Sequence, residues 1–282
     1  MHTLLKCGRF DLDLSSPQVM GILNTTPDSF SDGGRYADVG AVLAAAEGMI
    51  ADGATLLDIG GESSRPNAPF VSAAEEIDRV MPVLAAVHAL NVPISLDTRR
   101  TEVMHAALAA GYVDLINDIS ALEDDGAVAL LSQHEDVAIC LMHKQGEPQS
   151  MQQAPAYQDV VAEVGAYLKS RVQACLDAGI ALDRLLVDPG FGFGKTLAHN
   201  VDLMTGLQDW LLRIDVPVLI GVSRKTMLGQ MVGEPVAAER RGASVAAALA
   251  AVSRGAHIVR VHDVKDTVQA IRVWQNLGIF LR

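Results

Sequence analysis

Val19-Met20-Gly21-Ile22-Leu23 is a wholly apolar run that ends at the polar residue Asn24. A run that is apolar throughout, rather than alternating, is typical of a parallel strand that is buried on both faces. Seven further short apolar runs follow along the chain, at Thr55–Ile59, Ile94–Leu96, Leu115–Ile116, Val137–Met142, Leu185–Val187, Val218–Ile220 and Ile258–Val261. The sequence therefore predicts eight parallel strands.

Amphipathic patterns with helical spacing lie between these runs. An apolar stripe over residues 77–87 is preceded by Ser72 and Glu75, which have the spacing of a capping box. Similar stripes cover residues 161–176, 245–252 and 268–274. A strand and helix repeated eight times predict an α/β fold, a (β/α)8 TIM barrel that occupies residues 1–282 as a single domain. A doubly wound sheet is the alternative, although such a sheet usually has fewer strands.

The segment Thr3–Leu14 precedes the first repeat. Phe10, Leu12 and Leu14 alternate with charged residues, and Gly8 marks a turn. This pattern predicts an N-terminal β-hairpin that closes the bottom of the barrel.

The net charge, the apolar runs and the cysteines indicate which partners the protein binds and in which compartment it lies. Of the 282 residues, 22 are Lys or Arg and 34 are Asp or Glu, so the net charge is −12. An acidic protein repels nucleic acid and anionic membranes at long range, and no apolar run reaches the length of a membrane span. Cys7, Cys140 and Cys175 form no metal or disulfide motif. We expect a cytoplasmic protein that binds neither nucleic acid nor a membrane.

Polar residues collect where the predicted strands end, which is the catalytic face of a barrel of this kind. They are Asn24, Glu62, Ser63, Ser64, Arg65, Asp97, Asn117, Asp118, His143, Asp188, Ser223, Arg224, Lys225, Arg260 and His262. Taken singly, Asp97 or Asp188 could equally cap the helix that follows it. Helix capping explains one such residue well, but it does not readily explain polar residues at the end of every predicted strand.

Several of the few basic residues follow the last two predicted strands, where such barrels often hold phosphate. They are Arg224, Lys225, Arg260 and His262, and Arg65 could join them from the loop after the second strand. Guanidinium groups bind phosphate oxygens in pairs, which favours a diphosphate ligand. Asn24 offers a neutral oxygen suited to a Mg²⁺ ion that also binds the diphosphate.

The segment Gly190–Thr196, GFGFGKT, is close to two nucleotide-binding motifs but satisfies neither. A Walker loop requires Gly where Pro189 stands, and a dinucleotide fingerprint requires Gly where Lys195 stands. The segment is better interpreted as a flexible loop whose glycines let the backbone pass close to a ligand at Asp188.

Five segments in this order resemble the signatures of the dihydropteroate synthases. They are Gly21–Gly34, Asp58–Pro66, Asp188–Lys195, Ser223–Lys225 and Arg260–His262. The resemblance extends from about Val19 to about Val273. It implies a homodimer that condenses 6-hydroxymethyl-7,8-dihydropterin diphosphate with p-aminobenzoate, a reaction of folate biosynthesis that sulfonamides inhibit.

The resemblance also implies roles for individual residues. The pterin pocket is expected to contain Asp97, Asn117, Met142, Asp188, Phe193 and Lys225. The diphosphate site is expected to contain Asn24, Arg65, Arg260 and His262, with Mg²⁺ bound at Asn24. The p-aminobenzoate site is expected to contain Phe30, Ser64, Pro66 and Ser223. The residues expected to act in catalysis are Asp97, Lys225 and Arg260.

Two positions depart from the family pattern, which usually has Thr where Ser64 stands and Gly where Asn67 stands. Both lie in the predicted p-aminobenzoate region, so affinity for that substrate and for sulfonamides stays open. Three rival functions also stay open: a pterin-binding methyltransferase domain, an aldolase that uses Lys195 or Lys225 as a Schiff base, and a non-catalytic pterin-binding homologue.

Overall fold

Eight parallel strands form the centre of the protein, as the apolar runs predict. The computed structural model describes residues 4–25, 39–63, 70–146, 151–211 and 213–278. The strands are β3 (Gln18–Asn24), β4 (Leu56–Gly60), β5 (Ile94–Asp97), β6 (Leu115–Asp118), β7 (Ala138–Met142), β8 (Leu185–Asp188), β9 (Leu219–Ile220) and β10 (Ile258–Val261).

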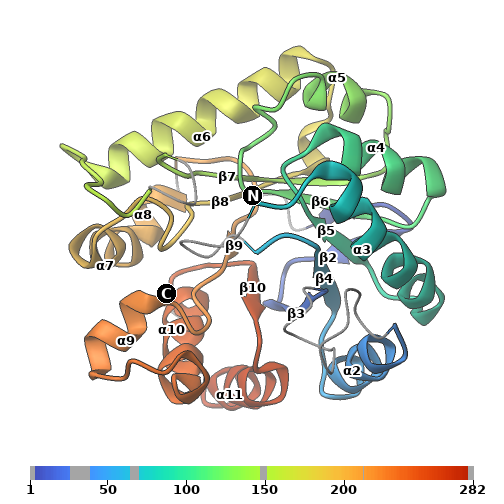
Figure 1. Cartoon of the computed structure of the whole chain (residues 1–282). Helices are drawn as coiled ribbons and strands as arrows, with labels where there is room; N and C mark the ends of the chain where they lie inside the picture. Colours follow the sequence, from blue (N-terminus) through green and yellow to red (C-terminus); the bar gives the residue numbers. More distant parts are fainter. Residues whose placement is uncertain (1–3, 26–38, 64–69, 147–150, 212, 279–282) are drawn as a thin grey trace.

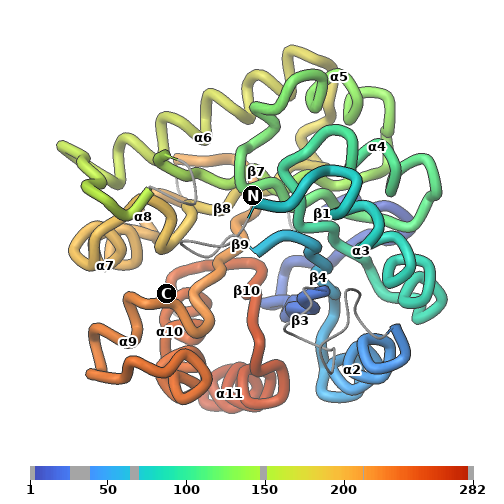
Figure 2. Tube along the Cα trace, in the orientation of Figure 1, coloured from blue at the N-terminus to red at the C-terminus, as the bar shows by residue number. Residues whose placement is uncertain are grey.

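The sheet closes on itself, which distinguishes a barrel from a doubly wound sheet. The strand order is β8-β7-β6-β5-β4-β3-β10-β9, and an isolated parallel bridge between Val187 and Val218 joins its two ends. Figure 2 follows the chain around the barrel, with β10 of the last repeat beside β3 of the first. The predicted (β/α)8 fold is confirmed.

Helices surround the strands (Figure 1). They are α2 (Val39–Ala51), α3 (Ala73–Val87), α4 (Thr101–Ala110), α5 (Ala127–Ser132), α6 (Val160–Asp177), α7 (Leu197–Thr205), α8 (Leu207–Leu211), α9 (Thr226–Val232), α10 (Arg241–Ser253) and α11 (Val264–Asn276). Short 3-10 turns lie at His88–Leu90, Leu182–Arg184 and Ala237–Glu239. Helix α3 begins as its capping pattern predicts, because the Ser72 side chain accepts a hydrogen bond from the Glu75 amide. Among the described residues, no helix has both the length and the apolar character needed to cross a membrane.

The N-terminal hairpin closes one end of the barrel. Strands β1 (Leu4–Cys7) and β2 (Phe10–Asp13) pair antiparallel. Leu5, Cys7 and Leu12 pack into an apolar cluster inside the barrel, whose other members are Leu14, Met20, Leu56, Leu115, Ala138, Cys140, Leu186, Leu219 and Ile258. This cluster confirms the predicted hairpin, and it leaves the opposite end of the barrel to the polar residues.

Candidate active site

Arg260 lies at the centre of the polar strand ends and binds two carboxylates. Its Nε donates to Asp58 Oδ2 at 2.5 Å, and its Nη2 donates to Asp97 Oδ2 at 2.7 Å. Arg260 lies on β10, and the two carboxylates lie on the neighbouring strands β4 and β5, which β3 separates from β10. Burial alone would lower the pKa of Arg260, but Asp58 and Asp97 hold that pKa above its ordinary value. The guanidinium therefore keeps its charge and a fixed orientation.

Asp58 is a polar residue of this centre to which the sequence analysis gave no role. Its side chain is fully buried, and its Oδ1 accepts hydrogen bonds from Ser95 Oγ at 2.5 Å and Asn117 Nδ2 at 3.3 Å. Asp58 thereby connects Arg260 to Asn117, a predicted pterin residue. The signal in the sequence was a carboxylate inside an otherwise apolar strand, which requires a buried partner.

Asp97 is an acid whose proton is held unusually tightly. Burial raises the pKa of Asp97 to about 7, with Arg260 opposing the rise and Asp58 adding to it. Asp118, at the end of the next strand β6, has a structural role instead. The carboxylate of Asp118 accepts hydrogen bonds from the amides of Ser120 and Leu122, at 2.6 and 2.7 Å, and so shapes the loop after β6.

Asp188 and Lys225 interact electrostatically with each other and with Arg260. Asp188 Oδ1 accepts a hydrogen bond from the Gly190 amide at 2.7 Å. Burial raises the pKa of Asp188, and the charge of Lys225 opposes this rise. Burial lowers the pKa of Lys225 to about 8, and the charge of Asp188 opposes this decrease. A Cβ atom on Gly221 would lie 3.8 Å from Asp188 Oδ2 and 4.0 Å from Arg260 Cδ. Gly221 therefore leaves the space between these two charged groups open.

An apolar surface adjoins Lys225. The Lys225 ammonium lies 4.1 Å from the centroid of the Phe193 ring, and it donates to the Phe191 carbonyl. Phe193 and Met142 share a small buried cluster with Ile119 and Met151. The structure thus brings the predicted pterin residues Met142, Phe193, Asp188 and Lys225 together, and it combines a flat apolar surface with charged hydrogen-bonding groups.

The predicted diphosphate residues are only partly brought together. Asn24 ends β3 beside Gly60, and His262 follows β10. The amide of His262 donates to Ser223 Oγ at 3.2 Å, and its Nδ1 lies 3.0 Å from the same atom. A residue predicted for the diphosphate thereby contacts a residue predicted for p-aminobenzoate. Arg224 is directed elsewhere, because its guanidinium donates to Asp263 at 2.6 and 3.0 Å.

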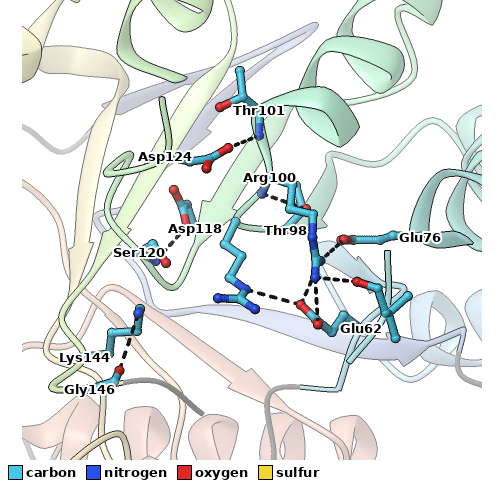
Figure 3. Close-up of polar contacts among 12 residues, drawn as sticks. Glu62, Glu76, Thr98, Arg100, Thr101, Asp118, Ser120, Asp124, Lys144 and Gly146 are labelled. Carbon is cyan, nitrogen blue, oxygen red and sulfur yellow. Dashed lines mark hydrogen bonds and ion pairs between the residues drawn. The ribbon is translucent and has the colours of Figure 1, made fainter. Parts of the chain in front are cut away.

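Four predicted site residues, Phe30, Ser64, Arg65 and Pro66, lie outside the described residues, as does Asn67. Their neighbour Glu62 belongs to a charged network that the sequence analysis did not identify. Arg100 binds both Glu62 oxygens, at 2.8 and 2.9 Å, and also binds Glu76 and the Val71 carbonyl (Figure 3). Arg100 thus ties the segment after β4 to the start of α3.

A metal ion would find few ligands from the described part of the chain. No group of three or more His, Cys, Asp or Glu side chains has the geometry of a metal site there. The half-buried amide of Asn24 can supply one oxygen. Mg²⁺ commonly keeps several water ligands and binds substrate phosphates with few protein ligands. The donor set therefore fits a Mg²⁺ ion held mainly by a diphosphate.

Comparisons with known proteins agree with this geometry. A family model described as "Pterin binding enzyme" matches residues 20–262. The dihydropteroate synthase of Neisseria meningitidis serogroup C is 57% identical, with 98% of each chain covered. The Xanthomonas albilineans dihydropteroate synthase, solved with 4-aminobenzoic acid, superposes with a TM-score of 0.91 at 46% identity and 99% coverage of both chains. The Burkholderia cenocepacia enzyme, solved with 7,8-dihydropteroate, gives a TM-score of 0.89 at 49% identity, with 98% of this chain and 96% of that chain covered.

The fold, the site and these matches place the chain in the family of pterin-binding enzymes. Within that family it belongs to the dihydropteroate synthases, which are transferases of folate biosynthesis. The matches extend over nearly the whole chain, so the rival assignments to a methyltransferase domain or an aldolase have no support.

Proposed function

We propose that the chain condenses 6-hydroxymethyl-7,8-dihydropterin diphosphate with p-aminobenzoate at the cluster around Arg260. The observation that carries the proposal is the placement of Lys225 over the Phe193 ring, where it also interacts electrostatically with Asp188. A carboxylate accepts the paired N–H donors of a pterin edge, and an ammonium donates to ring acceptors. Each buried charge offsets the cost of desolvating the other.

The diphosphate binds on the side of Asn24, Arg65 and His262, with a further contact to Arg260. Mg²⁺ at Asn24 would offset the charge that develops on the departing diphosphate. Because Arg260 is already paired with Asp58 and Asp97, it acts as an oriented donor and not as an unpaired positive charge. Departure of diphosphate breaks the bond between the exocyclic carbon and oxygen.

The exocyclic carbon then carries positive charge, which the dihydropterin ring delocalises. Asp97 in its ionised form stabilises this charge. The nitrogen of p-aminobenzoate attacks the carbon, the C–N bond forms, and the arylamine loses a proton. No covalent bond to the protein is required. Phe30, Ser64, Pro66 and Ser223 form the p-aminobenzoate site, which sulfonamides would also occupy.

The proposal includes a cytoplasmic homodimer. A groove between α10 and α11 is lined by the apolar side chains of Val245, Leu249, Val273, Trp274 and Leu277. Val273 is 58% exposed and Leu277 is 67% exposed, so a second copy could cover apolar surface here. The small residues Ser244, Ala248 and Ala251 of α10 are buried within the protomer, so they pack against the barrel and are not part of the proposed dimer surface. Sedimentation velocity tests the dimer, and a monomer at micromolar concentration contradicts it.

A binding experiment tests the two substrate sites. We expect a sulfonamide to bind with measurable heat only after inorganic diphosphate, Mg²⁺ and a pterin have been added, and p-aminobenzoate to compete with it. We also expect Asn24→Ala to weaken the binding of diphosphate in the presence of Mg²⁺ but not the binding of the pterin alone. Sulfonamide binding that p-aminobenzoate does not displace would contradict the proposal.

A further inference from the structure

Lys195 is a buried lysine to which the proposed reaction assigns no part. Burial lowers the pKa of Lys195 to about 7, which Asp188 opposes. Its side chain follows the glycine-rich loop after β8, and only 3% of the residue is exposed. The Nζ atom donates to the carbonyls of Gly190 at 2.9 Å and Phe193 at 3.1 Å, and it lies 2.9 Å from Nδ1 of His143. A buried ammonium is costly unless its donors are satisfied. The three acceptors meet that requirement.

The acceptor on His143 is a neutral imidazole nitrogen. Burial lowers the pKa of His143 to about 3, with the charge of Lys195 lowering it further. The ring is also held at its edge by Tyr167, at a centroid distance of 5.0 Å. His143 therefore gives Lys195 a rigid attachment at the end of β7, and Lys195 connects this strand to the loop after β8.

The loop itself has a conformation that needs such a support. Gly190, Gly192 and Gly194 all have left-handed φ values, of 70°, 76° and 62°. A Cβ atom on Gly190 would lie 1.9 Å from the His143 carbonyl oxygen, and one on Gly194 would lie 2.3 Å from the Gln145 carbonyl oxygen. The loop is thus pressed against the residues after β7. It is densely bonded in the structure, whereas the sequence analysis predicted a flexible loop.

The loop also positions groups on the ligand side. The Gly190 amide donates to Asp188, the Phe191 carbonyl accepts from Lys225, and the Phe193 ring lies below the Lys225 ammonium. Lys195 holds the same loop through the carbonyls of Gly190 and Phe193. The backbone carbonyls of this loop are therefore fixed by two lysine side chains.

From this geometry we infer that Lys195 is a positioning residue for pterin binding, acting through the glycine-rich loop on Asp188, Phe193 and Lys225. The inference rests on the proposed function, because it takes these three residues as the pterin contacts. Lys195 touches no substrate in this scheme. Its removal lets the loop carbonyls and the Phe193 ring move while Ser223 and His262, which follow β9 and β10, keep their contact.

The test compares Lys195→Met with the control Lys169→Met, which makes the same change at an exposed position of α6. We measure the Kd of 6-hydroxymethylpterin by calorimetry and the KM of p-aminobenzoate at saturating pterin diphosphate. A displacement of about 1 Å in a positioning group can cost about 100-fold. We expect a 10- to 100-fold (approximate) rise in the pterin Kd for Lys195→Met, a p-aminobenzoate KM within about three-fold of wild type, and no change in the control.

Lys195→Gln provides the second variant, because its amide keeps donors for part of the carbonyl set. We expect its pterin Kd to lie between those of wild type and Lys195→Met. If Lys195→Met does not fold, Lys195→Gln decides alone, and a pterin Kd equal to that of wild type overturns the inference. Equal losses for both substrates in Lys195→Met also overturn it. Failure of the proposed function is a separate result, because the wild-type chain would then form no dihydropteroate.

Discussion

Arg260 illustrates at the residue scale how this site handles charge. One guanidinium lies between two carboxylates, and Lys225 interacts electrostatically with a third carboxylate, that of Asp188. The described centre therefore contains more acid than base. Such an excess of carboxylates suits a pterin, whose N–H groups donate hydrogen bonds and whose exocyclic carbon becomes positive in the proposed reaction. In the proposed reaction, Mg²⁺ and the predicted residues Arg65 and His262 would assist Arg260 in binding the negatively charged diphosphate.

Removing the Arg260 side chain separates its structural and catalytic contributions. In Arg260→Met, Asp58 and Asp97 lose their buried partner, and we expect the free energy of unfolding to fall by about 3 kcal/mol. We expect kcat/KM to fall by about 10²–10³. Adding Asp58→Asn is expected to recover stability in urea titrations but not activity. Activity within a few-fold of wild type in Arg260→Met would contradict the proposed role of Arg260.

The raised pKa of Asp97 predicts the acid side of the pH profile. Folding raises this pKa from 3.8 to about 7, so Asp97 takes up a proton as the pH falls through 7. In the proposed mechanism the ionised form stabilises the cationic carbon, so we expect kcat/KM for the pterin diphosphate to decrease below about pH 7. Asp97→Asn should have low activity without this limb. If the decrease in kcat/KM at low pH is unchanged in Asp97→Asn, a group other than Asp97 causes it.

The same shift has the opposite consequence for stability. A carboxyl group whose pKa is raised by folding binds its proton more tightly in the folded state. Its stabilising effect is full below pH 3.8 and is lost as the pH rises to about 7. The raised pKa of Asp97 therefore lowers stability at neutral pH, and Asp97→Asn is expected to be more stable than wild type there.

At the scale of elements, the loop after β8 predicts a contrast between two glycines. Gly194 and Gly233 both have left-handed φ values, 62° and 72°. A Cβ atom on Gly233 would meet nothing within 4 Å, whereas one on Gly194 would meet the Gln145 carbonyl. We expect Gly233→Ala to cost about 1 kcal/mol of stability and Gly194→Ala about 2 kcal/mol more. We further expect only Gly194→Ala to weaken pterin binding, and equal effects of the two variants on thermal stability would contradict this account.

The elements could largely be predicted from the sequence, because strand and helix patterns are local. All eight apolar runs correspond to strands, and their ends differ from the structure by one residue or a few. The pairing of charges could not be predicted, because the partners are distant in the chain. Arg260 and Asp58 are 202 positions apart, and Arg224 and Asp263 are 39 positions apart. The sequence placed Arg224 among the phosphate residues, and its ion pair directs it elsewhere.

At the scale of the whole molecule, stability and function occupy opposite ends of the barrel. The hairpin β1–β2 fills one end, and the polar strand ends occupy the other. Leu5 is fully buried, and Leu4 beside it is 52% exposed. We expect Leu5→Ala to lose about 3 kcal/mol of stability and Leu4→Ala less than about 0.5 kcal/mol, by urea denaturation. Both variants should keep wild-type kcat at temperatures where they are folded, and a reduced kcat in Leu5→Ala would contradict the separation.

The central claim is that this barrel exchanges diphosphate for p-aminobenzoate on the pterin carbon. The most direct measurement is the rate of diphosphate release from 6-hydroxymethyl-7,8-dihydropterin diphosphate, with and without p-aminobenzoate and with Mg²⁺ present. The account predicts steady release that requires p-aminobenzoate, with one 7,8-dihydropteroate formed for each diphosphate, and it predicts a loss of about 10²–10³ in Lys225→Ala. Absence of p-aminobenzoate-dependent condensation with intact pterin substrate would contradict it.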